Sequence, residues 1–260
     1  MGARITTNLR EDTLNRRHLI KVLGLAVCLT FCLGTSASSA VAKTKITKKG
    51  FKYNGMHYWR AGSQNVKLGT YGNKRSSYGV EAHNDIKATN FRGKVDVSGV
   101  YQIDWSKDSK FGAQGQVQYV GYKGGASYSR EAKKGAKLKL VLMNVKKGPL
   151  QTIINKKSKG ALKFFKNNKN ARVVSGVWVV MEAQLADSIS NSGGVSFGGT
   201  TPNGMKFSGK FDAKSKTTTS VTIPRGAIFA YMTHKASKWN KKKRKKTTIK
   251  AMKDDQVGMR

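Results

Sequence analysis

Long runs in which apolar and polar residues alternate constrain the fold of this 260-residue chain most strongly. In residues 93–105 the odd positions carry apolar or small side chains, and the even positions are mainly polar. Residues 177–189 repeat this alternation. A two-residue period is typical of strands with one face in the core and the other in water. We therefore predict long amphipathic strands, with further examples at residues 114–118, 137–145 and 221–231.

One segment has the period of a helix instead. Six apolar residues between Leu150 and Phe165 fall at helical spacing, with lysines between them. Pro149 suits a helix start, and Gly160 is expected to divide the segment into two short helices. The order of strands, a short basic helical segment and more strands predicts an α+β protein. Its main feature is expected to be a β-rich, twisted antiparallel sheet.

The first 42 residues have the features of an export signal. Basic residues as far as Lys21 precede an apolar core, residues 22–34, that is too short to span a bilayer comfortably. Residues 40–42 (AVA) have the pattern of a cleavage site. Arg16 and Arg17 lie in a run that resembles a bacterial twin-arginine signal, and an ordinary Sec signal is the alternative. Either signal predicts a secreted or extracytoplasmic mature chain, and no later stretch is apolar enough to predict a transmembrane helix.

Motifs of catalytic or metal-binding chemistry are not found. Cys28 and Cys32 both lie within the predicted signal, so we expect no disulfide and no thiolate metal site in the mature chain. The three later histidines, His57, His83 and His234, are far apart, and no zinc-protease, serine-hydrolase or P-loop motif occurs. We therefore expect no catalytic residue, no metal and no cofactor. The alternative is an enzyme whose histidines and carboxylates meet only in the fold.

Positive charge is the second dominant property. Lys and Arg number 50 against 13 Asp and Glu, a formal net charge of +37 at pH 7. Such an excess repels itself in a compact fold and indicates an anionic partner. Lysine predominates over arginine, and lysine acts as a point charge whereas arginine makes bidentate contacts. This balance favours diffuse attraction to an acidic surface over sequence-specific recognition.

Three groups of basic residues are candidates for attracting acidic membrane lipids. A basic side chain near an acidic leaflet contributes about 1 kcal/mol, so a few suffice for salt-sensitive binding. The groups are Lys48, Lys49 and Lys52; Lys156, Lys157, Lys163 and Lys166; and Lys241, Lys242, Lys243, Arg244, Lys245 and Lys246. Candidate anchors at the membrane interface are Trp59, Trp105, Trp178 and Trp239, with a place in the core as the alternative.

Several stretches resemble the pore-forming domain of the gasdermin family. Residues 177–183 (VWVVMEA) resemble the strand after that domain's helical segment, and residues 221–231 (VTIPRGAIFAY) resemble its T-I-P-x-G strand. A basic stretch that ends at Trp239 follows, as it does in the family. Residues 92–97 (RGKVDV) are similar to the start of its first membrane hairpin, and residues 48–59 to its opening basic–aromatic strand. The resemblance predicts a pore-forming domain at residues 43–239, with residues 240–260 as a basic C-terminal tail.

The resemblance also implies a mechanism. Basic residues would bring the domain to acidic lipids, and residues of about 89–145 and 173–234 would unfold into long hairpins. Many copies would then join as a homo-oligomer into a β-barrel pore, whose closure pairs all strand edges. The chain departs from the family in its export signal and in lacking a match to the family's first lipid-contacting helix. The rival prediction is a non-enzymatic basic protein, retained on anionic cell-wall polymer or extracellular nucleic acid, that never inserts.

Overall fold

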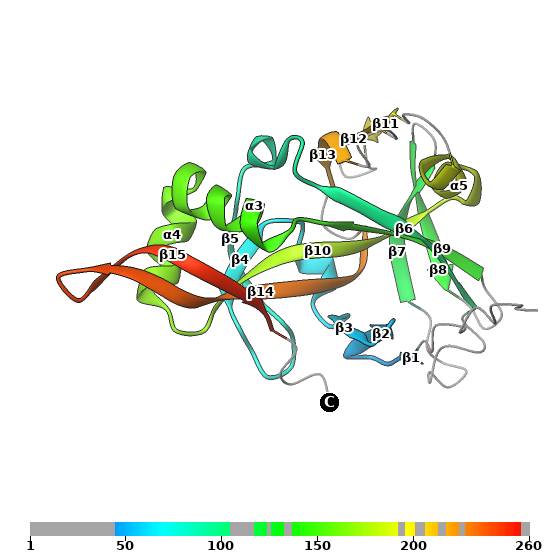
Figure 1. Ribbon diagram of the computed structural model, residues 1–260. Helices are drawn as coiled ribbons and strands as arrows, with labels where there is room; N and C mark the ends of the chain where they lie inside the picture. The colour runs from blue at the N-terminus through cyan, green and yellow to red at the C-terminus, as the bar shows by residue number, and fades with distance from the viewer. Residues whose placement is uncertain are drawn as a thin grey trace, which may run out of the picture. The chain divides into compact units, whose positions relative to one another are not determined.

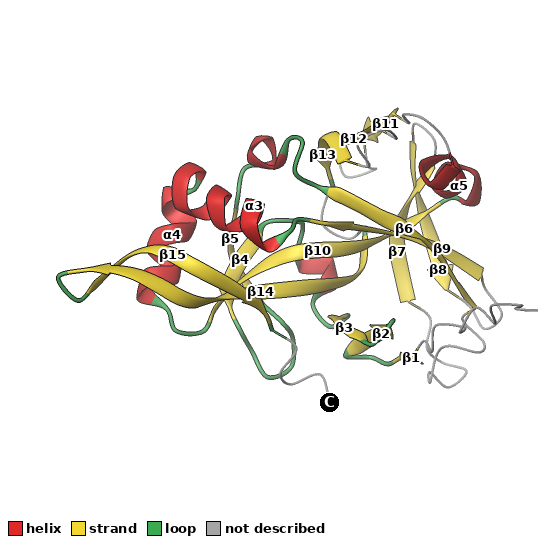
Figure 2. Cartoon of the chain, viewed as in Figure 1, coloured by secondary structure: helices red, strands yellow, loops and turns green. Residues whose placement is uncertain are grey.

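The computed structural model describes residues 45–104, 117–123, 126–132, 137–191, 196–200, 206–212, 217–223 and 227–255 (Figure 1). The predicted signal and Trp105 lie outside these residues. The architecture is α+β, as predicted, with a curled, mainly antiparallel sheet and short helices (Figure 2). Among the described strands, the pairing of β7 with β10 is the one parallel contact.

Strands follow one another in the sheet in the order β1-β2-β3-β14-β10-β9-β6-β13-β12-β11. In addition, β15 pairs with β14, β4 with β10 and β5, and β7 with β10 and β8. The strands are β1 Lys45–Ile46, β2 Gly50–Tyr53, β3 Met56–Trp59, β4 Thr70–Asn73, β5 Glu81–Asp85, β6 Asp96–Asp104, β7 Val117–Lys123, β8 Ala126–Ala132, β9 Lys137–Asn144, β10 Ala171–Met181, β11 Ser196–Thr200, β12 Lys206–Asp212, β13 Thr217–Thr222, β14 Ile228–Lys242 and β15 Lys245–Asp254. The helices are η1 Ser63–Asn65, η2 Ala88–Phe91, α3 Lys147–Thr152, the π-helical η3 Ile153–Lys157, α4 Lys159–Asn167 and α5 Ala183–Asn191.

Strand β10 is buried along its whole length. Its odd-numbered Val177 and Val179 belong to one hydrophobic core, and its even-numbered Trp178 and Val180 belong to another. The prediction of a strand with one wet face over residues 177–189 is therefore wrong. The chain also leaves the sheet at residue 182 and forms α5, because the apolar residues that follow suit one face of a helix equally well.

Strand β6 exchanges its faces partway along. Its register with β9 slips between Val97 and Val100. Val97 and Val100 both pack against the core that contains Val177 and Val179. Tyr101 packs against the core that contains Trp178 and Val180, and Ile103 belongs to that core. A bulge inserts a residue and reverses the side that later residues face. The predicted apolar stripe of residues 93–105 is thus divided between two cores.

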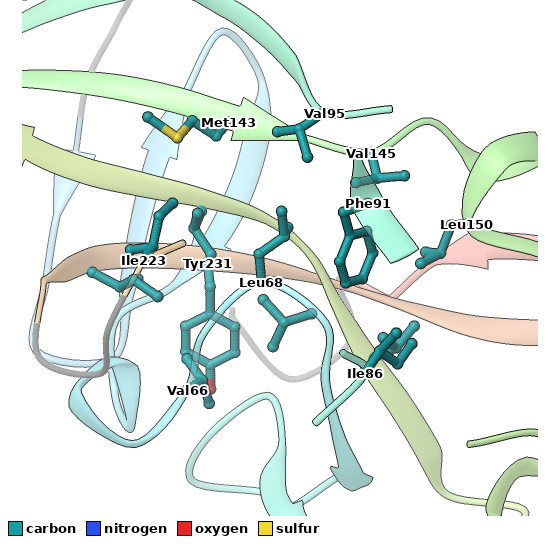
Figure 3. Packing of buried hydrophobic residues seen from close by; sticks show 14 of the residues in the cluster. Val66, Leu68, Ile86, Phe91, Val95, Met143, Val145, Leu150, Ile223 and Tyr231 are labelled. Carbon is teal, nitrogen blue, oxygen red and sulfur yellow. The ribbon is translucent and has the colours of Figure 1, made fainter. Parts of the chain in front are cut away.

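The two cores lie on opposite faces of the central sheet, defined here as β6, β9, β10 and β14. The larger core lies under helices α3, η3 and α4 and the segments around β4 and β5. Figure 3 shows part of it, with Tyr231 of β14 among aliphatic side chains. The smaller core is closed by β1, β2 and β3 on the other face.

The helical segment forms as predicted, with a different break. Its apolar residues Leu150, Ile153 and Phe165 are buried, so the lysines between them are turned outward. The break falls at Ser158, whose φ of −134° and ψ of 76° leave the helical region, and Gly160 lies within α4. No helix among the described residues is long and apolar enough to cross a membrane.

The predicted basic tail is wrong for residues 240–255. Strand β14 runs past Trp239 to Lys242, turns, and returns as β15. Ile249 and Met252 of β15 are buried in the larger core. These two apolar side chains fix β15 to the fold, so the domain does not end at residue 239.

Candidate anion-binding surfaces

Residues 241–246 form the tip of the β14–β15 hairpin, and this basic tip is the most concentrated positive charge in the chain. Lys243 and Arg244 make the turn, with φ of 49° and 66°. Lys242 is paired with Lys245, and Lys241 with Lys246, on the two strands. Residues 241–245 are exposed, and among the described residues none of them forms an ion pair.

This arrangement lowers the stability of the hairpin. Like charges directly opposite one another on neighbouring strands destabilise a sheet. Left-handed backbone at a non-glycine residue adds about 1 kcal/mol, and the same turn is made with less strain by Asn-Gly. A bound polyanion removes the repulsion between the lysines. The tip therefore has the chemistry of an anion-binding element rather than of a stabilising turn.

Contacts with the helical segment hold the hairpin in place. The side-chain amide of Asn155 donates to Ile249 O at 2.8 Å, and the Ile249 N–H donates to Asn155 Oδ1 at 2.9 Å. Lys246 Nζ donates to Lys166 O at 3.4 Å and lies 5.0 Å from the centre of the Trp239 ring. The predicted sites in the helices and at residues 241–246 are thus brought to one end of the sheet.

The lysines of the helical segment contribute to this basic end. Lys156, Lys157 and Lys163 are exposed, and Lys166 is half-buried. Helices η3 and α4 lie against β15, as Figure 2 shows. We call this group, together with the basic tip, the tip surface.

Lys48, Lys49 and Lys52 lie elsewhere. Lys48 and Lys49 are exposed in the turn between β1 and β2, Lys52 is exposed on β2, and these strands cover the smaller core. That core contacts the first residues of β14, whereas the basic tip is at the last. Because β14 has 15 residues, its ends are about 45 Å apart at ~3.3 Å per residue. The candidate lysines therefore form two surfaces, and the structure does not bring them together.

The tryptophans are mostly structural in this conformation. Trp59 and Trp178 are 0% and 2% exposed, so the expectation that they lie at a membrane interface does not hold for the folded chain. Trp239 is half-buried against the larger core. A tryptophan in an alternating strand gives the same sequence signal whether its face meets lipid or a second layer of protein.

Two long segments leave the central sheet at the same end. The first excursion, residues 105–136, joins β6 to β9, and the second, residues 182–227, joins β10 to β14. Asp104 pairs with Lys137, and Val179 pairs with Ile228. Met181 also pairs with Lys139, so these four strand ends adjoin. Neither excursion can be located from periodicity alone, because its position depends on which strands pair.

A buried serine, a buried histidine and a half-buried aspartate come together at the base of the β14–β15 hairpin. His234 Nδ1 is hydrogen-bonded to Ser175 Oγ, and its Nε2 lies 2.8 Å from Asp254 Oδ1. The pKa of His234 is lowered to about 4, chiefly by burial and also by Lys147, against the opposing effect of Asp254. His234 and Asp254 line an open cavity of about 350 Å³, but Ser175 is fully buried and does not line it. This serine is therefore not presented to a molecule in the cavity.

The buried carboxylate of Asp255 strengthens the same region. Asp255 Oδ2 accepts from Arg172 Nε at 2.6 Å and lies 3.0 Å from Lys74 Nζ. Burial alone would raise the pKa of Asp255, but these two cations hold it below its usual value. The pair Arg172–Asp255 joins the end of β15 to β10. Among the described residues, no cluster of His, Cys, Asp or Glu is arranged to hold a metal ion.

Comparisons of the chain with protein-family models, curated proteins and solved structures give no match.

Proposed function

We propose that the mature chain is a secreted protein that binds acidic membranes, oligomerises and forms a β-barrel pore, as the resemblance to the gasdermin pore-forming domain implies. The observation that carries the proposal is the common origin of the two excursions. They begin and end at four adjacent strand ends of one antiparallel sheet. If both extended, β6, β9, β10 and β14 would each lengthen without changing neighbours.

The excursions have the length that such an extension requires. A strand that crosses a bilayer needs about 9–11 residues. The first excursion has about 30 residues and the second about 45, enough for two crossing strands and a turn in each. Strand directions alternate across the central sheet, so β6 of one copy and β14 of the next are antiparallel when they adjoin. A ring of copies therefore closes with every backbone edge paired, as the bilayer demands.

Dye release from vesicles tests the proposal. Purified residues 43–260 are added to acidic and to zwitterionic vesicles at low and high salt. Release from acidic vesicles, suppressed by salt and accompanied by ring-shaped oligomers, supports a pore. Salt-sensitive binding to acidic vesicles without release or oligomers would reject it.

A second function is favoured by the position of the tip surface. The lysines of its basic tip lie about 45 Å from the strand ends where the excursions begin. They are therefore suited to hold an anionic polymer, such as cell-wall polymer or extracellular nucleic acid, whether or not the excursions at the opposite end of the sheet enter a membrane. Retention of the chain on purified anionic wall polymer, lost when residues 241–246 are replaced by glutamine, supports this function. Unchanged retention would reject it.

A further inference from the structure

Strands β1, β2 and β3 cover an aromatic surface at the end of the central sheet where both excursions begin. The ring centre of Phe51 lies 5.5 Å from that of Trp178 and 5.4 Å from that of Phe229, edge to face in both cases. Tyr58 lies 5.6 Å from Trp178. At the margin, the rings of Tyr53 and Tyr101 are 4.3 Å apart and both side chains are half-buried.

The backbone connection of this cover to the central sheet is small. Strand β3 pairs with β14 at one position, Trp59 with Tyr231. Trp59 belongs to the larger core, where a side chain at Gly79 would collide with its ring at 2.4 Å. The cover is also held by side chains of the smaller core and by Arg60, whose guanidinium lies 4.5 Å above the ring of Phe229. Trp59 therefore anchors the end of β3 in the larger core, whereas β1 and β2 pack on the central sheet through side chains of the smaller core.

We infer that β1–β3 is a lid over a bilayer-docking surface, and that acidic headgroups open it through Lys48, Lys49 and Lys52. This inference rests on the proposed function. The three lysines are exposed on the lid itself. The face beneath it carries Trp178 and Tyr101, residue types that favour the membrane interface, among aliphatic residues of β9. An acidic leaflet attracts the lid and accepts the aromatic face that the lid leaves.

Closing the lid covalently tests this inference without changing the packing. Photo-oxidation couples the adjacent rings of Tyr53 and Tyr101 as dityrosine, which joins β2 to β6. Tyr53→Phe is the matched control, because it keeps the ring but cannot form this link. Coupled wild-type protein should release dye from acidic vesicles at least 10-fold more slowly than irradiated Tyr53→Phe. Equal release rates would overturn the lid and leave the pore intact.

A protein that releases no dye in any form would reject the pore, and the lid is then tested by the coupling itself. Irradiation on acidic vesicles should form several-fold less of the Tyr53–Tyr101 link than irradiation in solution, because an open lid separates the rings. An unchanged yield on vesicles would overturn the lid.

The role of the lid lysines has its own control. Replacing Lys48, Lys49 and Lys52 by glutamine should slow dye release at least 10-fold, or restore the dityrosine yield on vesicles if no dye is released. Replacing Lys159, Lys169 and Lys250, three exposed lysines outside the candidate groups, removes the same charge and should leave both readouts unchanged. An equal effect of the two triple variants would show that total charge, and not the lid, responds to the lipid.

Discussion

Burial of His234 at the base of the β14–β15 hairpin makes the stability of the fold depend on pH. The ring is 3% exposed. The groups that face it are Ser175 of β10, Asp254 of β15 and Lys147 of α3. Its pKa falls from 6.5 to about 4, chiefly because burial disfavours the charged ring. The folded state therefore keeps a neutral imidazole at pH values where the unfolded chain binds a proton.

The sign and size of the effect follow from this difference. Below pH 6.5 the unfolded chain gains protons that the folded chain does not, so the free energy of unfolding decreases as pH falls. Between pH 7.5 and 5 the decrease is about 2 kcal/mol, and it approaches about 3 kcal/mol below pH 4. The pKa of Asp255 lies below its usual value of 3.8. The stability that Asp255 contributes is lost only when pH falls through that lower pKa, outside this interval.

Urea unfolding of residues 43–260 at pH 7.5, 6 and 5 measures the effect. His234→Gln does not titrate, so its free energy of unfolding should change between pH 7.5 and 5 by about 2 kcal/mol less than that of the wild type. Parallel pH dependence of the two proteins would refute the assignment. A wild type that is more stable at pH 5 would show that Asp254 holds the ring protonated in the fold.

Three further substitutions test local features by urea unfolding. Arg244→Gly removes a left-handed non-glycine residue from the turn and should stabilise the fold by about 1 kcal/mol; a loss of stability would contradict the strained turn. Asn155→Ala leaves the buried backbone groups of Ile249 without partners and should cost about 2–4 kcal/mol, whereas Asn155→Asp keeps the acceptor and should cost less. Gly72→Ala places a Cβ 1.7 Å from a backbone oxygen of β5 and should cost more than 3 kcal/mol. Gly148→Ala, with open space around it, is the matched control and should be neutral or stabilising.

The sequence predicts those parts of the fold that depend on neighbouring residues. The helical segment is an example, since the spacing of Leu150, Ile153 and Phe165 determines a buried face and turns the intervening lysines outward. The strand-rich α+β class is likewise confirmed. The sequence also locates the basic residues that are candidates for binding an anionic surface, because runs of charge such as residues 241–246 are visible in it directly.

Parts of the fold that depend on distant residues are not predicted. Alternation in β10 cannot show that both faces are covered, because the covering residues come from β1–β3 and from the helices. The bulge after Val97 reverses β6 without a change in composition. Residues 240–255 have the composition of a tail apart from Ile249 and Met252, and the burial of these two side chains depends on helices far away in the sequence. For the same reason, the division of the lysines between two ends of the sheet follows from strand pairing alone.

That division predicts separate tasks for the two ends. At 0.15 M salt a charge is screened beyond about 8 Å. The basic tip lies about 45 Å from the end of β14 that the lid covers, so it adds little to the attraction between the protein and a leaflet that meets the lid. Replacing residues 241–246 by glutamine should therefore change dye release from plain acidic vesicles by less than about 3-fold. Wild-type protein should release dye faster from vesicles grafted with a linear polyphosphate, because the tip then reaches an anion outside the bilayer. The same variant should not show this increase. If the variant also loses dye release from plain acidic vesicles, the basic tip itself meets the leaflet. The excursions of a copy bound in this way point away from the membrane that they would have to enter.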